Sequence, residues 1–435
     1  MTVYLHSLGC DKNLTDSEVM LGLLFEKGYK SVSEPSEADM IIVNTCGFIK
    51  EAVEESIETI LEMASYKNDT IGRCKSLVVT GCMAQRYKSD ILTEIPEVDK
   101  ILGVNDYPKI TGKNFDIFDD ELLKKRVNTM PVHVANVKIS EGCDNCCAYC
   151  TIPSIRGPYR EREFESIINE CKMLVKNGAK ELVMIAQDTA IYGMQLYKRQ
   201  RLHELLDEIS KIDGVCWVRV MYTYPEHIYG GLIETIAENK KICNYLDMPV
   251  QHSHEDVIKR MGRVAADIKK IISQLKERDI AVRTTLITGF PGESTDEFEH
   301  LCNFVKESEF DRLGVFVYSR EEGTPAAKMK PQIKSSVKKA RQQKIMEIQA
   351  DIVERHNKEL MGETLKIMVD GSILDDNEVV YCGRSEKHAY DVDGTVFFTV
   401  PEDFAELMSG DAVYVKITQN HGYDVYGELV DTVEV

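Results

Sequence analysis

The sequence lacks the segments that would place a protein in or across a membrane. No run of 18 or more apolar residues occurs, so no transmembrane helix is expected. The N-terminus, Met-Thr-Val-Tyr-Leu-His, has no basic region followed by an apolar run, so no signal peptide is predicted. Thirteen cysteines, an odd number scattered along the chain, disfavour a disulfide scaffold. We therefore expect a cytoplasmic protein whose cysteines serve metal or thiol chemistry.

Basic residues are scarce at one end of the chain. The net charge is −19, and residues 361–435 hold sixteen Asp or Glu residues against four Lys or Arg residues. A segment this acidic should repel a phosphate backbone and attract a basic partner. The alternative is a solvated acidic face that only aids solubility, and composition alone does not separate the two.

The most informative motif is a cysteine triplet with no fourth ligand beside it. Cys143, Cys147 and Cys150 have the spacing C-x3-C-x2-C. A zinc site needs four ligands, and no histidine lies within the next fifty residues. An electron-transfer cluster needs a fourth cysteine followed by proline, which is also absent nearby. Three thiolates on a four-iron cluster leave one iron open to activate a small molecule, so the triplet favours catalysis. Cys146 lies inside the motif, and its role stays open.

The first region, residues 1–125, alternates strand and helix patterns. Short apolar runs predict strands over 3–8, 40–44 and 76–80. Helical patterns follow them, over 17–26, 52–63 and 84–95. This alternation predicts a doubly wound parallel α/β domain.

Each of these three strands ends in a cysteine, namely Cys10, Cys46 and Cys82. Ligand sites in open α/β sheets lie at the carboxyl ends of the strands, so this fold would bring three thiolates to one edge. The adjacent glycines let the backbone approach a bulky inorganic core. A lone cysteine would more often be a buried hydrophobe, but three at equivalent positions predict a second three-thiolate cluster. The other cysteines have no ligand spacing and are expected to pack: Cys74, Cys171, Cys216, Cys243, Cys302 and Cys382.

Two further domains follow. Residues 131–360 carry six strand patterns with helical patterns between them, over 136–140, 181–186, 215–221, 245–249, 281–288 and 312–318. Six β/α units predict a partial, open (β/α)6 form of the TIM-like barrel, with the triplet after its first strand, and a charged linker helix over 335–360. Residues 361–435 carry five strand patterns, over 364–369, 379–382, 395–399, 412–418 and 425–434. They predict a small antiparallel β-barrel.

The triplet at the mouth of a partial barrel resembles the radical S-adenosylmethionine superfamily. In that superfamily the open iron binds S-adenosylmethionine, and one electron cleaves it to methionine and a 5′-deoxyadenosyl radical. The motifs at 7–18, 44–48 and 81–86 resemble the N-terminal domain of the methylthiotransferases, whose third part is a TRAM β-barrel. The resemblance covers the whole chain. It implies two [4Fe-4S] clusters, the second on Cys10, Cys46 and Cys82, where it would handle the sulfur.

Within this family the chain resembles most the members that act on ribosomal protein uS12. The similar stretches are 7–13, 140–145, 152–157 and 186–189. The resemblance implies methylthiolation of the β-carbon of an aspartate in uS12, either free or on the ribosome. It also implies an electron donor such as flavodoxin or ferredoxin, and a sulfur donor. The acidic tail favours this basic substrate, since neutralising phosphates dominates affinity for nucleic acid and tRNA is therefore disfavoured.

Position along the barrel also gives hypotheses for cofactor contacts. They follow the triplet or the strand ends, at Tyr149, Gln187, Asp188, Gln251, Gly289 and Glu293. Tyr149 is placed to stack on the adenine, with simple packing as the equal alternative. Gly289 and Glu293 lie in a stretch, 286–293, that resembles the superfamily's glycine-containing segment near the adenine. No residue is singled out as a catalytic acid, base or nucleophile.

Two other functions stay open on the sequence. One is a tRNA methylthiotransferase acting on a modified adenosine, for which the arginine-rich stretches 159–163 and 198–201 could contact RNA. These stretches are short and locally offset by acids, so a solvated face explains them equally well. The other is a non-enzymatic iron–sulfur electron carrier or ribosome-binding factor, which would not consume S-adenosylmethionine.

Overall fold

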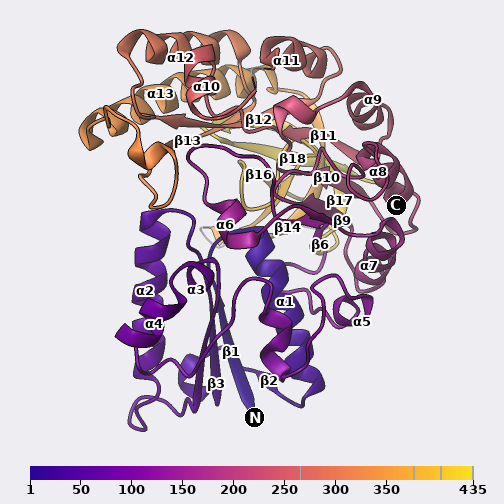
Figure 1. Cartoon of the computed structure of the whole chain (residues 1–435). Coiled ribbons are helices and arrows are strands. Elements are labelled where there is room, and N and C mark those ends of the chain that lie inside the picture. Colours follow the sequence, from indigo (N-terminus) through magenta and orange to yellow (C-terminus); the bar gives the residue numbers. More distant parts are fainter. Residues whose placement is uncertain (265, 376–377, 402–403, 434–435) are drawn as a thin grey trace.

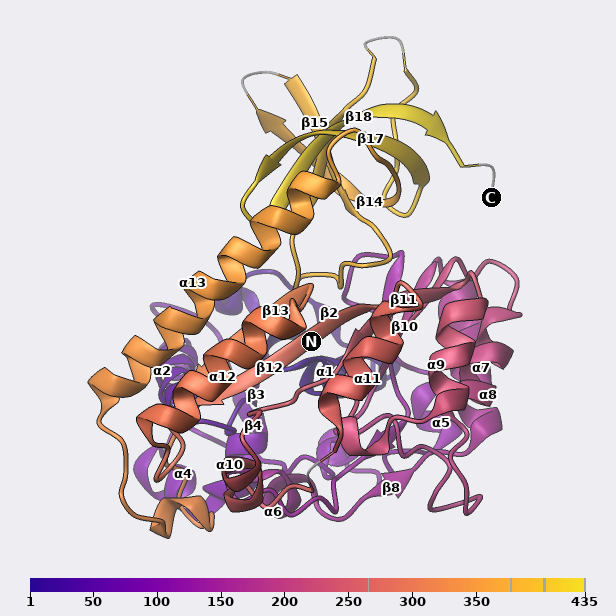
Figure 2. The same cartoon turned by 90° about the horizontal axis from the view of Figure 1, so that it is seen from above.

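The structure is a computed structural model that describes residues 1–264, 266–375, 378–401 and 404–433. An N-terminal α/β domain lies below a larger α/β domain in Figure 1, and a small β-barrel lies behind them. Figure 2 shows the long helix α13 (Ser335–Glu359) running from the larger domain to this barrel. No described helix is long and apolar enough to cross a membrane.

The N-terminal domain holds a five-stranded parallel sheet in the order β2-β1-β3-β4-β5. The strands are β1 (Thr2–Ser7), β2 (Lys30–Ser31), β3 (Met40–Thr45), β4 (Ser76–Gly81) and β5 (Lys100–Ile101). Helices α1 (Asp11–Glu26), α2 (Lys50–Ser65), α3 (Cys82–Arg86) and α4 (Lys88–Glu94) cover it. Ile41, Ile42 and Val43 are fully buried, because β3 packs helices on both of its faces.

Two helix predictions in this domain need correction. The pattern over 84–95 forms two helices, since Tyr87 leaves the helical conformation at φ −123° and ψ 31°. Helix α1 starts at Asp11, six residues before the predicted start at Ser17. Its first turns are polar yet buried, so an apolar pattern could not reveal them.

The central domain is a six-stranded parallel sheet in the order β13-β12-β11-β10-β9-β6. The strands are β6 (Val134–Lys138), β9 (Glu181–Ile185), β10 (Trp217–Val220), β11 (Ile242–Asp247), β12 (Ala281–Thr288) and β13 (Arg312–Val317). β6 and β13 form the two edges of this sheet, so the barrel is open, as predicted. Two very short strands, β7 (Ser140–Glu141) and β8 (Arg160–Glu161), pair beside it.

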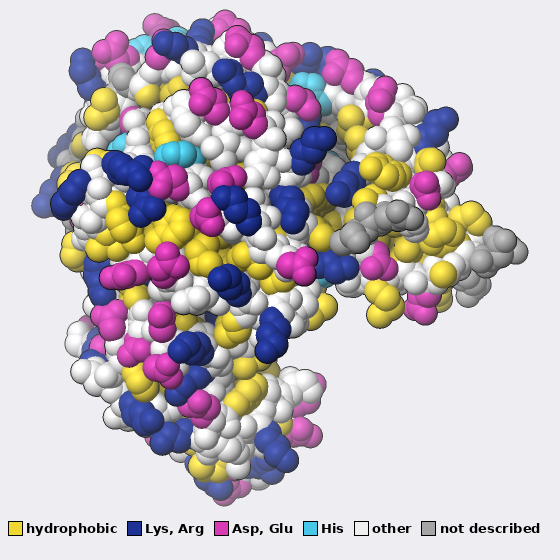
Figure 3. Space-filling view, turned by 90° about the vertical axis from the view of Figure 1, so that its right-hand side faces the viewer, with side chains coloured by type: hydrophobic (Ala, Val, Ile, Leu, Met, Phe, Trp, Pro, Cys, Tyr) yellow, Lys and Arg dark blue, Asp and Glu magenta, His cyan; other side chains and the backbone are white. Residues whose placement is uncertain are grey.

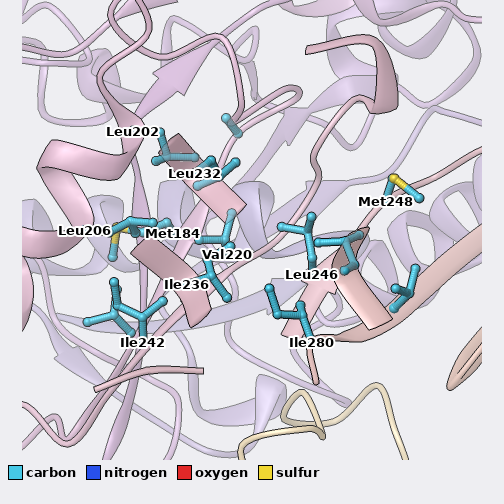
Figure 4. Close-up of a cluster of buried hydrophobic side chains, with 14 of the residues drawn as sticks. Met184, Leu202, Leu206, Val220, Leu232, Ile236, Ile242, Leu246, Met248 and Ile280 are labelled. Carbon is cyan, nitrogen blue, oxygen red and sulfur yellow. The ribbon is translucent and has the colours of Figure 1, made fainter. Parts of the chain in front are cut away.

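Helices cover the outer face of this sheet. They are α7 (Phe164–Lys176), α8 (Leu202–Ser210), α9 (Gly230–Glu238), α11 (Ile268–Lys276) and α12 (Thr295–Ser308). The short helix α10 (Glu255–Arg260) instead packs Val257 near Ala148 of the cysteine loop. Figure 4 shows Leu206 of α8 and Ile236 of α9 beside Met184 and Val220 of the strands. Two short helices lie where the domains meet. α5 (Asp120–Leu123) packs on α1 within the N-terminal domain, and α6 (Ile152–Arg156) of the central domain lies against α3.

The C-terminal domain is a closed five-stranded barrel in the order β14-β15-β16-β18-β17. The strands are β14 (Thr364–Asp375), β15 (Glu378–Arg384), β16 (Val396–Thr399), β17 (Ala412–His421) and β18 (Asp424–Thr432). Its pairs are antiparallel, as predicted, except that β16 and β18 run parallel. The predicted end of the last strand, Glu434, lies outside the described residues.

Buried ion pairs fix this barrel to the central domain. Glu181, the first residue of β9, lies 2.8 Å from Arg384 of β15 and 2.6 Å from Arg219 of β10. Arg219 also donates to the Glu386 carbonyl, and the Tyr245 hydroxyl donates to Asp393. The loop after β15 therefore docks against the strands of the open barrel.

Candidate functional site

The three strand-end cysteines of the N-terminal domain meet at one edge of the sheet. Cys10 caps α1, Cys46 follows β3, and Cys82 begins α3 directly after β4. Cys10 is exposed, Cys46 half-buried and Cys82 buried. A Cβ added to Gly9 would lie 3.3 Å from the Cys46 sulfur, which shows how closely the loops approach.

Small residues make this convergence possible. Gly81 has a φ of +94°, and a Cβ there would lie 2.3 Å from the Asn44 side-chain oxygen. A Cβ on Gly47 would lie 2.6 Å from the Met83 nitrogen. Neither position has space for a side chain, so both glycines are required where the strand ends pack together.

The second triplet lies in the loop that leads from β7 into α6. Cys143 and Cys147 are buried, and Cys150 is half-buried. The Cys147 sulfur contacts the Tyr224 hydroxyl, and the Cys150 sulfur accepts a hydrogen bond from the Ile152 nitrogen at 3.4 Å. Cys146 is exposed, and its sulfur lies 3.6 Å from the Asp144 carbonyl of its own loop.

The chemistry of these thiols suits binding of a metal cluster. Burial raises the pKa of Cys82 and Cys143 to about 11 and that of Cys150 to about 12. A buried thiolate needs an adjacent positive charge, which coordinated iron would supply. Each triplet would leave a fourth position without a cysteine, as the spacing predicted.

The sulfur positions of the two triplets do not form a single-ion site. Across the described residues, one group of three His, Cys, Asp or Glu donors lies within 4.8 Å of one another, and it is His254, Asp256 and Glu297. Both cysteine triplets are therefore more widely spread than ligands around one zinc ion. Glu297 already pairs with Arg260 at 3.0 Å and caps α12, so this third group is a structural cluster.

The polar start of α1 joins the two triplets. Asn13 donates to the Leu8 and Thr45 carbonyls, which hold the loops of Cys10 and Cys46. Asp16 lies 2.5 Å from Lys138 of β6, and Lys138 lies 2.8 Å from Glu141. Because these groups are almost fully buried, the contact is a packed domain boundary.

Arg156 spans the distance between the two triplets. It ends α6, which begins two residues after Cys150. Its guanidinium donates to Glu141 at 2.9 Å, to Asn13 at 2.5 Å and to the Cys82 sulfur at 3.7 Å. One side chain therefore connects the loop of Cys143, Cys147 and Cys150 to a cysteine of the N-terminal triplet. Figure 1 shows α6 between the ends of α1 and α3 and the barrel above.

A second bridge runs from the start of α1 to the carboxyl ends of the barrel strands. Lys12 donates to the Ala186 carbonyl at 3.1 Å and lies 3.2 Å from the centroid of the Tyr222 ring. The Tyr222 hydroxyl donates to Asp11 at 2.7 Å. Burial lowers the pKa of Lys12, while Cys10 and Asp11 oppose the shift.

The predicted cofactor contacts fall into two groups. The first has unused hydrogen-bonding capacity, since the buried side-chain oxygens of Gln187 and Gln251 have no partner among the described residues. Gln251 and Tyr149 line a cavity of 180 Å³ together with Phe48 and Ile49 of the N-terminal domain. The free acceptor of Gln251 beside this largely apolar cavity suits a ligand with polar hydrogens.

The second group is held by the protein itself. Asp188 accepts from His227 at 2.6 Å and from Asn145 at 3.3 Å. Glu293 accepts from the backbone nitrogens of Gly289 and Phe290 at 2.6 and 2.9 Å and from Arg341 at 2.7 Å. A Cβ on Gly289 would lie 2.3 Å from the Lys338 side chain, so this turn packs under α13. These residues shape the strand ends.

Sequence reasoning missed the bridging residues Lys12, Arg156 and Tyr222. Each belongs to a different part of the chain, and none has a spacing that signals a ligand. The arginines of the two arginine-rich stretches, 159–163 and 198–201, form ion pairs with carboxylates of the protein. Arg160 pairs with Asp116, Arg162 with Glu170, and Arg199 and Arg201 both pair with Glu204.

Family models match all three parts of the chain. A model described as uncharacterized protein family UPF0004 matches residues 2–103, the radical SAM superfamily matches 137–305, and a TRAM domain matches 361–430. The ribosomal protein uS12 methylthiotransferase RimO of Lachnoclostridium phytofermentans is 48% identical over 432 residues, covering 95% of this chain and 97% of that protein. The protein of the same name from Geobacter sulfurreducens is 44% identical over 445 residues, covering 98% and 97%.

A solved structure shares the fold. The radical S-adenosylmethionine methyltransferase TsrM from Kitasatospora setae, with cobalamin and a [4Fe-4S] cluster bound, superposes with a TM-score of 0.54. The match covers 75% of this chain and 73% of that one at 13% identity. At this identity the likeness concerns the fold alone.

Proposed function

Since this chain belongs to the radical S-adenosylmethionine methylthiotransferases named for ribosomal protein uS12, we propose that it methylthiolates the β-carbon of an aspartate in uS12. One observation carries the two-cluster form of this proposal. Two three-cysteine sites lie across a single domain boundary, and Arg156 connects them by contacting Cys82 from the helix that follows Cys150. An electron carrier or binding factor would need neither the two incomplete sites nor their proximity.

In this proposal each triplet holds one [4Fe-4S] cluster, and residues 1–125, 131–360 and 361–435 form the methylthiotransferase, radical and TRAM domains. When bound, S-adenosylmethionine and the two clusters supply hydrogen-atom abstraction and sulfur insertion, which no side chain provides. The chain's own residues bind, orient and exclude water. The residues proposed to contact the cofactor are Tyr149, Gln187, Asp188, Gln251, Gly289 and Glu293. Asp188 and Glu293 are in addition held in place by hydrogen bonds from the protein.

The cavity beside Tyr149 is suited to protecting reactive chemistry. Its walls include Ile287, Phe316 and Val317 of the barrel, and Phe48 and Ile49 close it from the N-terminal domain. An apolar wall keeps water away from the reacting atoms and so limits side reactions. The N-terminal domain therefore completes the site that the open barrel begins.

The substrate assignment rests on the relatives' names and on charge. The acidic C-terminal segment suits a basic ribosomal protein better than tRNA. The arginines of the two basic stretches are engaged by carboxylates, so they offer little free charge to RNA. On the face shown in Figure 3, Lys and Arg side chains are interspersed with Asp and Glu. We further infer a cytoplasmic enzyme, reduced by flavodoxin or ferredoxin and resupplied by a separate sulfur donor.

Anaerobic reconstitution tests the two-cluster form. The wild type should bind about eight irons per chain, and alanine at all three positions of either triplet should leave about four. Replacing Cys10, Cys46 and Cys82 should abolish sulfur insertion but preserve formation of 5′-deoxyadenosine. Full iron in either triple variant would refute the ligand assignment. The matched control is Cys146→Ala, whose exposed thiol should be dispensable for both clusters.

Mass spectrometry of a deletion strain tests the substrate. The uS12 aspartate should lose its methylthio group while tRNA nucleosides remain unchanged. An unchanged uS12 together with a missing tRNA modification would refute uS12 as the substrate and identify tRNA instead.

A further inference from the structure

Lys12 is a buried cation at the boundary between the two cysteine triplets. It is 7% exposed and lies two residues after Cys10. Its ammonium reaches across to the barrel, where Ala186 directly follows β9 and Tyr222 lies two residues after β10. The charge therefore stands beside the N-terminal triplet and at the carboxyl ends of the strands that carry the barrel's site.

Lys12 differs from the other buried cations at this boundary. Arg126, Lys138, Arg156 and Arg162 each lie within 4.0 Å of a carboxylate. Among the described residues the Lys12 ammonium donates its hydrogen bond to a backbone carbonyl, that of Ala186, and the neighbouring Asp11 accepts from the Tyr222 hydroxyl. An ammonium has three donors, and the Ala186 carbonyl uses one of them. A buried charge is costly unless it is paired, so this position favours an anion.

We propose that Lys12 determines specificity by binding the side-chain carboxylate of the substrate aspartate. This inference rests on the proposed function, and it identifies what the enzyme recognises at the reacting residue. The carboxylate carbon is bonded directly to the β-carbon. An ion pair with Lys12 holds the carboxylate, and it thereby positions the adjacent β-carbon between the radical triplet and the sulfur-handling triplet.

Recognition by Lys12 requires that the target residue of the substrate carry a negative charge. An asparagine has nearly the same shape as aspartate but no charge to pair with the ammonium. A site that holds an unpaired buried cation should reject it, because the cation would remain unpaired. Simple hydrophobic fit, by contrast, separates such close analogues poorly.

The test uses the reconstituted holoenzyme and fluorescent uS12 peptides with Asp, Asn or Ala at the target position. Wild type should bind the Asp peptide about 10- to 100-fold more tightly than the Asn peptide, the range for one charge-assisted hydrogen bond. Lys12→Met keeps an apolar side chain of similar length. It should lose this preference, because binding of the Asp peptide becomes weaker while binding of the Asn peptide is unchanged. Lys12→Arg should keep most of it. In turnover, Lys12→Met should raise KM for the Asp peptide.

A purely structural role for Lys12 predicts a different pattern. Lys12→Met would then weaken the binding of both peptides equally, and that result would overturn the inference. Tyr222→Phe is the matched control, because it loosens the same domain contact at Asp11 but keeps the ring under Lys12. It should retain the Asp preference.

The inference stays testable if Lys12→Met fails to fold or to bind iron. Equal binding of the Asp and Asn peptides by the wild type alone would overturn it. A wild type that discriminates between the peptides but leaves uS12 unmodified would instead refute the proposed function.

Discussion

Replacing Arg156 by glutamine should weaken the joint between the two triplets. Its side chain is 1% exposed and lies 2.9 Å from Glu141 and 3.5 Å from Asp16. Without the guanidinium, these two buried carboxylates share a single cation, Lys138. Removing one partner from a buried ionic network costs about 3–5 kcal/mol, which is a large fraction of the roughly 5–15 kcal/mol that stabilises a domain.

Urea denaturation of the reduced apoprotein measures this loss. Arg156→Lys keeps the charge but not the planar fork that reaches Glu141 and Asn13 together, so it should fall between wild type and Arg156→Gln. Arg160→Gln is the matched control, because Arg160 pairs with Asp116 on the surface, where side chains are 43% and 55% exposed. That change should cost less than about 1 kcal/mol. Equal midpoints for Arg156→Gln and Arg160→Gln would contradict the role given to the network. Iron content of Arg156→Gln should also fall at the N-terminal triplet, because Arg156 contacts Cys82.

Three further predictions test the domain contacts and the strand ends. Although burial opposes the shift, Arg384 and Arg219 lower the pKa of Glu181 to about 2, so its stabilisation is complete above the ordinary value of 4.5 and is lost as the pH falls toward 2. Glu181→Gln should therefore destabilise the protein by about 3–5 kcal/mol at neutral pH and by less near pH 3, and a pH-independent difference in urea midpoint would contradict this. The hydrogen bond that His227 donates to Asp188 raises the pKa of His227 above 6.5, so the stabilising effect is complete below 6.5 and is lost as the pH rises through the raised value. His227→Gln should lower the melting temperature more at about pH 6 than at about pH 9, and the reverse order would exclude a charged pair. Gly81→Ala should destabilise by about 1–3 kcal/mol and lower iron content, because its Cβ would lie 2.3 Å from Asn44. Gly28→Ala is the control, because Gly28 has a φ of +82° and nothing lies within 4 Å of an added Cβ. This variant should lose stability only through backbone strain and should keep its iron content.

Elements that are buried on both faces could be predicted from the sequence. Ile41, Ile42 and Val43 form a continuous apolar run because helices cover both sides of β3. The cysteines at the strand ends could be predicted for a related reason. Parallel strands carry their carboxyl ends to one edge, so sequence position alone brings Cys10, Cys46 and Cys82 together.

Elements whose buried residues are polar could not be predicted in the same way. The first turns of α1 bury Lys12, Asn13 and Asp16, and such a run carries no apolar period. Their partners, among them Lys138 and Arg156, come from the central domain more than a hundred residues away. Only the tertiary structure shows that this polar run is a domain boundary.

The start of α1 combines two tasks that are usually separate. It presents Cys10 to the N-terminal triplet, and within two turns it also supplies Lys12, Asn13 and Asp16 to the central domain. A rigid helix fixes the distance between these groups. The position of the N-terminal triplet relative to the barrel therefore depends on the same contacts that hold the domains together. Variants that loosen those contacts should lose sulfur insertion more than cleavage of S-adenosylmethionine. In the proposed function, only sulfur insertion requires the two triplets to be held at a fixed distance from each other.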